Sequence, residues 1–254
     1  MARDDGRARR ATGGTHAGVG QGPGRPGRGQ TRPRHRRGTH APGAVLRTED
    51  LEVRFTVSRT VVREAVQALQ SKRLLRSSPR VGLTVRPVAD WHLYDPDVIR
   101  WRLDGPARTE LLDDLTELRG AVEPAATAAA ARRADRDQRK RLLECSAHMR
   151  AAAATRDRAA FLEADIAFHR LILTMSANPL FAQLAPVTEQ LLRGRAALKL
   201  LPAAPDPADA ARHDAVAIAV AAADPATAET AMRAVVAESL ADIHMRLHAR
   251  EVQV

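Results

Sequence analysis

The spacing of apolar and polar residues predicts two regions of different architecture. From about residue 108 to 250, Ala and Leu recur at intervals of three and four, which is typical of a helical bundle. Residues 42–89 instead show two short helical patterns followed by two short strand patterns. The predicted fold is therefore mainly α, with an N-terminal winged helix-turn-helix followed by an all-α helical-bundle domain.

The first helical pattern is Thr48–Phe55. We expect Thr48 to cap this helix, and two acidic residues in its first turn suit the helix dipole. Leu51 and Phe55 are one turn apart and are expected to pack inward. A tight turn at Thr56 and Val57 then leads into the second helix, as in a helix-turn-helix unit.

The second helical pattern begins at Ser58, whose hydroxyl is a good N-cap. Its apolar face is formed by Val62, Ala65, Val66 and Leu69. Arg59 and Arg63 are four residues apart, so they project together from another face. This arrangement suits a recognition helix that enters a DNA groove by its N-terminal end. The alternative is an ordinary amphipathic helix with solvated arginines.

Two strand patterns follow, Leu74–Ser78 and Leu83–Val88, with a turn at Pro79–Gly82 between them. We interpret them as a β-wing, with Arg80 at its tip within reach of phosphate or the minor groove. Residues 45–88 hold nine Lys or Arg against four Asp or Glu. This local excess of positive charge is expected of a DNA-binding domain.

Residues 90–107 are expected to link the two domains. The stretch Trp91–Leu103 contains both tryptophans and the only tyrosine, with a short helix from Pro96. We expect its aromatic residues to dock between the domains, and a plain apolar connector is the alternative. Prolines mark several breaks in the bundle, whose helices are predicted at 108–133, 135–155, 157–176, 179–200, 208–222 and 225–249.

Composition changes the picture mainly at the N-terminus. The 254 residues carry a formal net charge of +10, but residues 1–44 alone hold ten Arg and two Asp, with eleven of the fifteen glycines. We predict that residues 1–41 are a disordered head. Such a head either adds salt-sensitive attraction to nucleic acid or results from a wrong start site or reading frame. A single cysteine and the lack of an apolar run of ~20 residues favour a cytoplasmic protein without membrane spans.

The bundle contains one pattern with metal-binding chemistry. Asp165 and His169 are one turn apart and share an apolar face with Phe161, Phe168 and Ile172. A buried carboxylate is costly unless it is paired or bound to a metal. An oxygen and a nitrogen one turn apart can ligate one ion. A buried Asp–His hydrogen bond, or a helix face that is more exposed than expected, explains the pattern as well.

The N-terminal region resembles the winged helix of GntR-type bacterial regulators. The resemblance rests on Pro42-Gly43-x-x-Leu46, on Ser58-Arg59-Thr60-x-x-Arg63-Glu64-Ala65, and on the wing ending in Gly82-x-x-Val85. It implies that Arg59, Thr60 and Arg63 contact double-stranded operator DNA and that Gly82 lies against its backbone. The family normally has an amphipathic helix before the Pro-Gly, and the stretch from Gly20 to His40 contains no such pattern.

The bundle resembles the FCD ligand-binding domain of the FadR branch of this family. The motif Asp-x-x-Phe-His at Asp165 and His169 implies a divalent metal site for Zn, Ni or Mn, with His213 as the third ligand. The family's fourth ligand position falls on Val235, which cannot ligate, and Glu238 is a weak substitute. Three protein ligands leave a position for water or an effector oxygen.

The same resemblance implies an effector site. Arg119 in Leu118-Arg119-x-x-x-Glu123-Pro124 is similar to an arginine that holds an effector's carboxylate, although a structural ion pair with an acid in the bundle is equally compatible with the residues. Asn178 occupies another family position, where a helix cap is the alternative. The linker is similar to that of galactonate-type, sugar-acid-responsive repressors. The prediction is therefore a homodimeric repressor that binds a small carboxylate and is not an enzyme. A member with impaired DNA binding and a metal-dependent enzyme are the alternatives.

Overall fold

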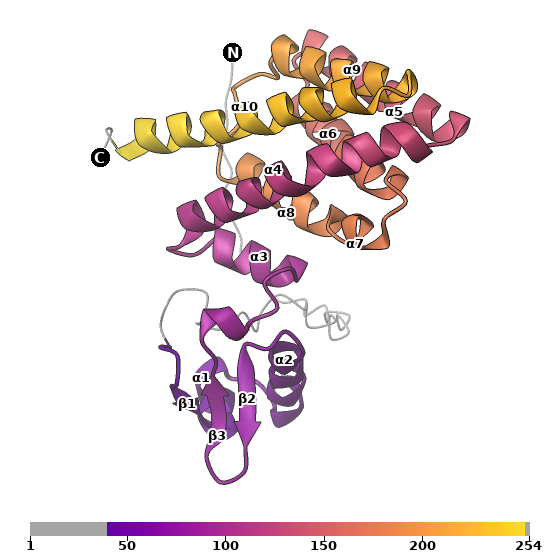
Figure 1. Cartoon of the computed structure of the whole chain (residues 1–254). Helices are drawn as coiled ribbons and strands as arrows, with labels where there is room; N and C mark the ends of the chain where they lie inside the picture. The colour runs from indigo at the N-terminus through magenta and orange to yellow at the C-terminus, as the bar shows by residue number, and fades with distance from the viewer. Residues whose placement is uncertain (1–39, 252–254) are drawn as a thin grey trace, which may run out of the picture. The chain divides into compact units, whose positions relative to one another are not determined.

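The computed structural model describes the backbone of residues 40–251 and the side chains of residues 40–246. The predicted head, 1–41, lies almost wholly outside these residues, as does the stretch where the family's first helix is expected. Within the described residues the chain is mainly α-helical, with one small sheet near its N-terminal end (Figure 1). The predicted fold class is therefore confirmed.

A winged helix-turn-helix forms the N-terminal domain. Helices α1 (Thr48–Phe55) and α2 (Arg59–Ser71) precede the hairpin of β2 (Leu75–Ser78) and β3 (Gly82–Val85). A two-residue strand, β1 (Val45–Leu46), pairs with the other side of β3, so the antiparallel sheet has the order β1-β3-β2. The sequence did not indicate β1, because two residues are too few to show an alternating pattern.

The caps of the two helices differ from each other. The predicted Thr48 cap is wrong: Arg47 is the N-cap of α1, it has no side-chain capping hydrogen bond, and Thr48 is already helical. Ser58 caps α2 as predicted, since its hydroxyl accepts a hydrogen bond from the Val61 backbone N–H. Thr56 adopts the left-handed helical backbone conformation, with a φ of 52°, and forms the tight turn between the helices.

The core of the winged domain extends into the linker. Its buried apolar cluster consists of Val62, Val66, Leu69, Leu74, Leu75, Leu83, Val85 and Val98. Val98 lies on the linker helix α3 (Pro96–Leu103), which begins at the predicted residue. Trp91 and Trp101 pack against this cluster, whereas Tyr94 is 61% exposed. The expected docking of the aromatic residues is therefore wrong for Tyr94.

The C-terminal domain is a bundle of long helices. Its elements are α4 (Arg108–Arg133), α5 (Arg136–Ala154), α6 (Arg158–Met175), α7 (Pro179–Ala182), α8 (Ala185–Ala197), α9 (Pro207–Ala221) and α10 (Pro225–Glu251). The single helix predicted at 179–200 is wrong, because α7 ends at Ala182 and α8 begins at Ala185, with two non-helical residues between them. Pro186 lies in the first turn of α8, where a missing backbone N–H costs least.

The bundle surrounds a core rich in small apolar residues. Helix α10 packs along α4 and α9, while α5 packs against α6 and α9 (Figure 1). Phe168, Ile172, Val216 and Met232 are among the fully buried side chains of this core. No helix among the described residues is long and apolar enough to cross a membrane.

Candidate functional site

The exposed face of α2 carries the residues predicted to contact DNA. Arg59, Thr60 and Arg63 are all exposed, whereas Val62 and Val66 on the opposite face are buried. Neither arginine has an ion-pair partner among the described residues. The first two turns of α2 therefore present two exposed guanidinium groups to the solvent.

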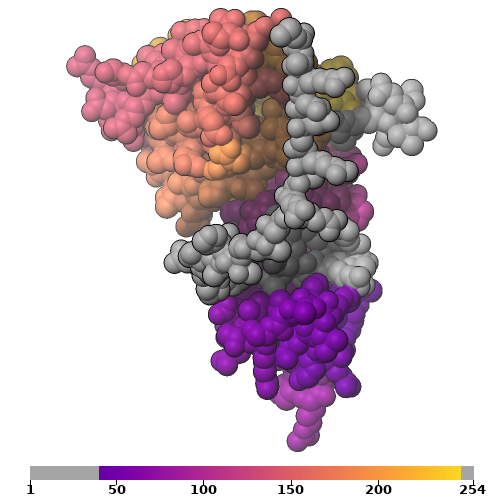
Figure 2. Space-filling model, turned by 180° about the vertical axis from the view of Figure 1, so that it is seen from behind, coloured from indigo at the N-terminus to yellow at the C-terminus, as the bar shows by residue number. Residues whose placement is uncertain are grey.

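The wing projects from the body of the small domain (Figures 1 and 2). Arg80 lies at its tip, is exposed and has a φ of 63°. Gly82 has a φ of 106°, and a Cβ atom at this position would lie 3.0 Å from the carbonyl oxygen of Leu46 on β1. Glycine is therefore required here by both backbone conformation and space.

The helical domain contains a charged cavity between α4, α6, α8, α9 and α10. Its volume is about 60 Å³, on the order of a few water molecules. The polar side chains that line it are Arg119, Arg158, Asp165, His169, Arg195, Asp206, Asp209, Arg212, His213, Glu238, Ser239 and Asp242. All three residues predicted to bind a metal, and Arg119, thus border one cavity.

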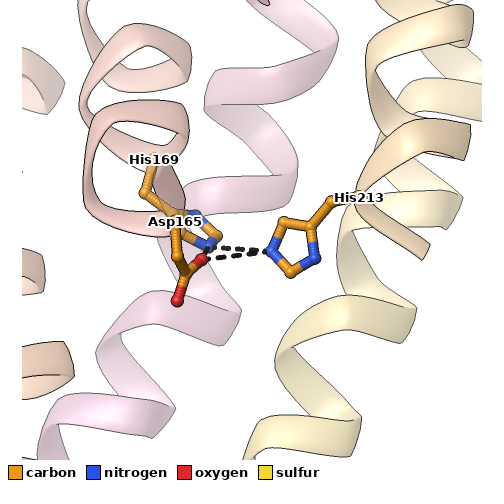
Figure 3. Close-up of side chains that lie close together, drawn as sticks. All are labelled: Asp165, His169 and His213. Carbon is orange, nitrogen blue, oxygen red and sulfur yellow. Dashed lines mark hydrogen bonds and ion pairs between the residues drawn. The ribbon is translucent and has the colours of Figure 1, made fainter. Parts of the chain in front are cut away.

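Asp165, His169 and His213 converge within this cavity (Figure 3). Asp165 Oδ1 lies 3.2 Å from His169 Nε2 and 3.3 Å from His213 Nε2, and the two Nε2 atoms are 3.4 Å apart. Oδ1 is buried and accepts no well-directed hydrogen bond. One oxygen and two imidazole nitrogens that face one another in this way fit a divalent metal ion.

The other ring nitrogens of the two histidines are held by separate partners. His169 Nδ1 lies 2.9 Å from Glu123 Oε2, and His213 Nδ1 lies 2.9 Å from the backbone oxygen of Asp209. Acceptors at both Nδ1 atoms favour the tautomer that leaves a lone pair on each Nε2. Both histidines thus direct Nε2 toward Asp165, and Nε2 of His169 also lies 3.0 Å from Arg119 Nη2.

The electrostatics of the cluster favour a cation. Burial tends to raise the pKa of Asp165, but its closeness to His169 and His213 holds that pKa well below its usual range. Burial tends to lower the pKa of His213, but contact with Asp165 and Asp209 raises it to about 10. Without a metal the site therefore pairs the carboxylate with a protonated His213. A divalent cation would displace that proton and supply the positive charge in its place.

Arg119 is buried and forms a bidentate ion pair with Glu123. Its Nε lies 2.9 Å from Oε1 and its Nη2 lies 3.1 Å from Oε2, while Nη2 is also 3.0 Å from His169 Nε2. Thr188 adds a hydrogen bond to Glu123 Oε1. The attraction of Arg119 and His169 outweighs burial and keeps the pKa of Glu123 far below its usual range. Arg119 Nη1 is buried without a hydrogen-bond partner, and Arg119 is among the residues that line the cavity.

Sequence reasoning did not assign a role to Glu123. The sequence spacing does indicate that Glu123 pairs with Arg119, because the two residues are four apart and therefore neighbours on one helix face. The ion pair that was considered for Arg119 is present, and it leaves one nitrogen of the guanidinium unpaired.

The wall near the predicted fourth ligand position is apolar. Val235 is 3% exposed and lines the cavity, as expected for a residue that cannot ligate. Glu238 also borders the cavity, but its carboxylate lies 3.9 Å from Arg212 and it is outside the metal-binding group. The metal-ligand group among the described residues is therefore the predicted trio.

Asn178 lies apart from this site. Its side-chain oxygen accepts a hydrogen bond from the Leu180 backbone N–H, so it caps α7. It is not among the residues that line the cavity. The structure thus brings Arg119 to the metal-binding trio but leaves Asn178 outside, and an effector contact by Asn178 stays a prediction.

A winged helix-turn-helix followed by a helical domain with a charged cavity is the architecture of a class of transcriptional regulators. Residues 34–85 match the family described as bacterial regulatory proteins, gntR family, and residues 114–238 match the FCD domain. The galactonate operon transcriptional repressor of Escherichia coli (strain K12) is 34% identical over 157 residues, which cover 61% of this chain and 68% of the repressor. The chain therefore belongs to the GntR family and carries an FCD domain.

Two further comparisons agree with this assignment. The uncharacterized HTH-type transcriptional regulator YieP of the same organism is 33% identical over 150 residues, 59% of this chain and 65% of YieP. These matches span about two thirds of each curated relative. The solved structure of E. coli McbR/YncC is similar over 84% of this chain and 93% of that chain, with a TM-score of 0.51. At 19% identity, this last likeness concerns the fold alone.

Proposed function

We propose that the chain is a cytoplasmic, homodimeric repressor that binds operator DNA and is released by a small carboxylate such as a sugar acid. Arg59, Thr60 and Arg63 contact the operator in the major groove, and Arg80 with the wing backbone at Gly82 contacts its phosphates. The exposed, unpaired arginines of α2 and the wing support this role. The similarity to a galactonate operon repressor supports both the sign of regulation and the class of effector.

One observation supports the proposal that the cavity binds an effector carboxylate. Three metal-ligating atoms converge in a cavity whose wall also contains the unpartnered Nη1 of Arg119. Asp165, His169 and His213 would hold a divalent cation such as Zn, Ni or Mn. When bound, such an ion would supply positive charge that attracts an effector carboxylate. Arg119 donates Nη1–H to the same carboxylate, while Glu123 fixes the guanidinium from its other side.

The walls of the cavity connect binding to regulation. They are formed by α4, α6, α8, α9 and α10, so an effector bound there contacts several helices of the bundle at once. An effector changes the affinity for DNA only if it binds one arrangement of the bundle better than the other.

An electrophoretic shift assay tests DNA binding and its regulation by an effector. The full chain is mixed at low salt with the DNA upstream of its own gene, with and without galactonate and other sugar acids. We expect a shift that a binding acid reverses and that Arg63→Ala weakens. The absence of any shift at low salt would contradict the proposed regulator.

Metal analysis tests the cavity separately. We expect bound divalent metal in the purified wild type and a strong loss in His213→Ala. His244→Ala is the matched control, because His244 is exposed and lies 2.9 Å from Asp113, outside the cavity. Equal metal content in wild type and His213→Ala, or none in the wild type after incubation with Zn²⁺, Ni²⁺ or Mn²⁺, would refute the site.

A further inference from the structure

A second buried arginine, Arg195 on α8, also lines the cavity. It is 6% exposed, and its Nη1 donates a 2.6 Å hydrogen bond to the hydroxyl of Ser239 on α10. Its Nε is buried and has no hydrogen-bond partner. Arg195 therefore brings to the cavity a donor that the protein itself leaves unsatisfied, which is costly for a buried group.

Arg195 also lacks a direct ion pair. Among the described residues no carboxylate lies within 4.0 Å of its guanidinium. Burial, and then the positive charge of Arg119, lower the pKa of Arg195. Arg193, two residues away on the same helix, is 40% exposed and pairs with both Glu163 and Glu189. The more buried arginine of the two is thus the one without a counter-ion.

Most acidic residues of the cavity have partners other than Arg195. Asp206 accepts the Ala208 backbone N–H at the start of α9, and Asp209 lies close to His213 and Arg212. Glu238 lies near Arg212. Asp165, Asp209 and Asp242 attract Arg195, but none of these carboxylates lies within ion-pair distance of its guanidinium. Among the described residues no carboxylate therefore pairs directly with Arg195, and a ligand carboxylate could do so.

We propose that Arg195 forms a second anion subsite, so that the effector is a hydroxylated dicarboxylate rather than a monocarboxylate. This inference rests on the proposed carboxylate site: one carboxylate lies beside Arg119 and the metal-binding trio, and the other pairs with Arg195. Ser239 is a positioning residue that holds the guanidinium through Nη1 and leaves Nε toward the ligand. Hydroxyl groups between the two carboxylates can donate to Asp209 or Asp242 in the cavity wall.

Matched pairs of acids test the inference by isothermal titration of the full chain loaded with Zn²⁺. Each pair has the same number of carbons and differs in the second carboxylate: galactarate against galactonate, and malate against 3-hydroxybutyrate. We expect the diacid of at least one pair to bind roughly tenfold or more tightly, because a charge-assisted hydrogen bond to a buried arginine is strong. In Arg195→Met this preference should fall below about threefold.

Arg193→Met is the control, since it removes a neighbouring charge outside the cavity, and it should keep the wild-type preference. Thermal unfolding without ligand gives a second readout. Arg195→Met should be as stable as the wild type or more so, because it removes an unpaired buried charge. A marked loss of stability would instead indicate that Arg195 has a structural role in the bundle, for example through its hydrogen bond to Ser239, and would overturn the inference.

The outcomes separate this inference from the function on which it rests. Equal affinity within both pairs, or a preference for diacids that survives in Arg195→Met, would overturn the second subsite and leave the carboxylate site intact. If none of the four acids bound and none altered the DNA shift, both the carboxylate site and the second subsite would be contradicted.

Discussion

Glu123 holds two nitrogens of Arg119 and leaves the third, Nη1, without a partner. The same carboxylate also lies 2.9 Å from His169 Nδ1. A single glutamate therefore orients both the arginine and one of the metal-ligating histidines. The geometry of the cavity depends on a residue that contacts neither the proposed ion nor the effector.

Removing Glu123 should destabilise the domain strongly. Glu123→Ala leaves the Arg119 guanidinium buried without its counter-ion, so we expect a loss of about 3–5 kcal/mol in the free energy of unfolding. Urea unfolding followed by circular dichroism measures this loss. The double variant Arg119→Met, Glu123→Leu should recover most of it, because an apolar pair avoids the buried charge. A loss below about 1 kcal/mol in Glu123→Ala would show that the ion pair is not structural.

Much of the fold was predictable because long amphipathic helices have a strong period. Helices α4, α5, α6, α9 and α10 begin and end close to their predicted residues, where caps and prolines mark the boundaries. The two-residue strand β1 was missed, since its pairing with β3 depends on tertiary contact. The break between α7 and α8 was missed because the apolar spacing continues across Pro186.

The candidate site was predictable only as a set of residues. The spacing of Asp165 and His169 indicated one shared helix face, and family resemblance added His213 from a distant helix. That Glu123 joins Arg119 to His169 could not be inferred, since it depends on how α4 and α6 pack. The sequence also does not tell which of two nearby arginines, Arg193 or Arg195, lines the cavity, and the structure places Arg195 there.

Two arginines of the winged domain should affect DNA binding in different ways. Arg80→Ala removes a proposed phosphate contact, so it should weaken binding to all sequences and reduce the slope of log affinity against log salt by about 0.9. Arg63→Ala removes a proposed base contact and should cost about 1–3 kcal/mol of preference for the operator. Fluorescence anisotropy at several salt concentrations measures both effects. Arg141→Ala, an exposed change on α5, should leave the affinity unchanged, and an equal loss there would indicate a non-specific charge effect.

Two glycines with positive φ should differ in their tolerance of alanine. Gly82→Ala places a Cβ 3.0 Å from the Leu46 carbonyl oxygen in an already strained conformation, so we expect a loss of about 1–3 kcal/mol and weaker DNA binding. Gly43 has a φ of 84°, and a Cβ atom added there would meet nothing within 4 Å, so Gly43→Ala should cost only about 1 kcal/mol. Thermal unfolding of both variants compares them. Equal losses would show that the close approach of β1 to the wing is unimportant.

Two helical glycines should respond to alanine with opposite signs. A Cβ on Gly194 of α8 would lie 2.5 Å from Cδ1 of the buried Leu103 on α3, whereas a Cβ on Gly120 of α4 meets its nearest atom, Val236 Cγ1, at 3.8 Å. Gly120→Ala should therefore raise the free energy of unfolding by about 0.5–1 kcal/mol through helix propensity. Gly194→Ala should lower it by about 1–3 kcal/mol through overpacking.

A second change identifies the cause of that loss. Leu103→Ala removes the atom that the new methyl group would meet, so Gly194→Ala should be better tolerated in the Leu103→Ala background than in the wild type. Urea unfolding of the two single variants and the double variant gives the coupling free energy. If the two changes are additive, the loss in Gly194→Ala does not arise from contact with Leu103, and α8 does not depend on glycine to approach α3.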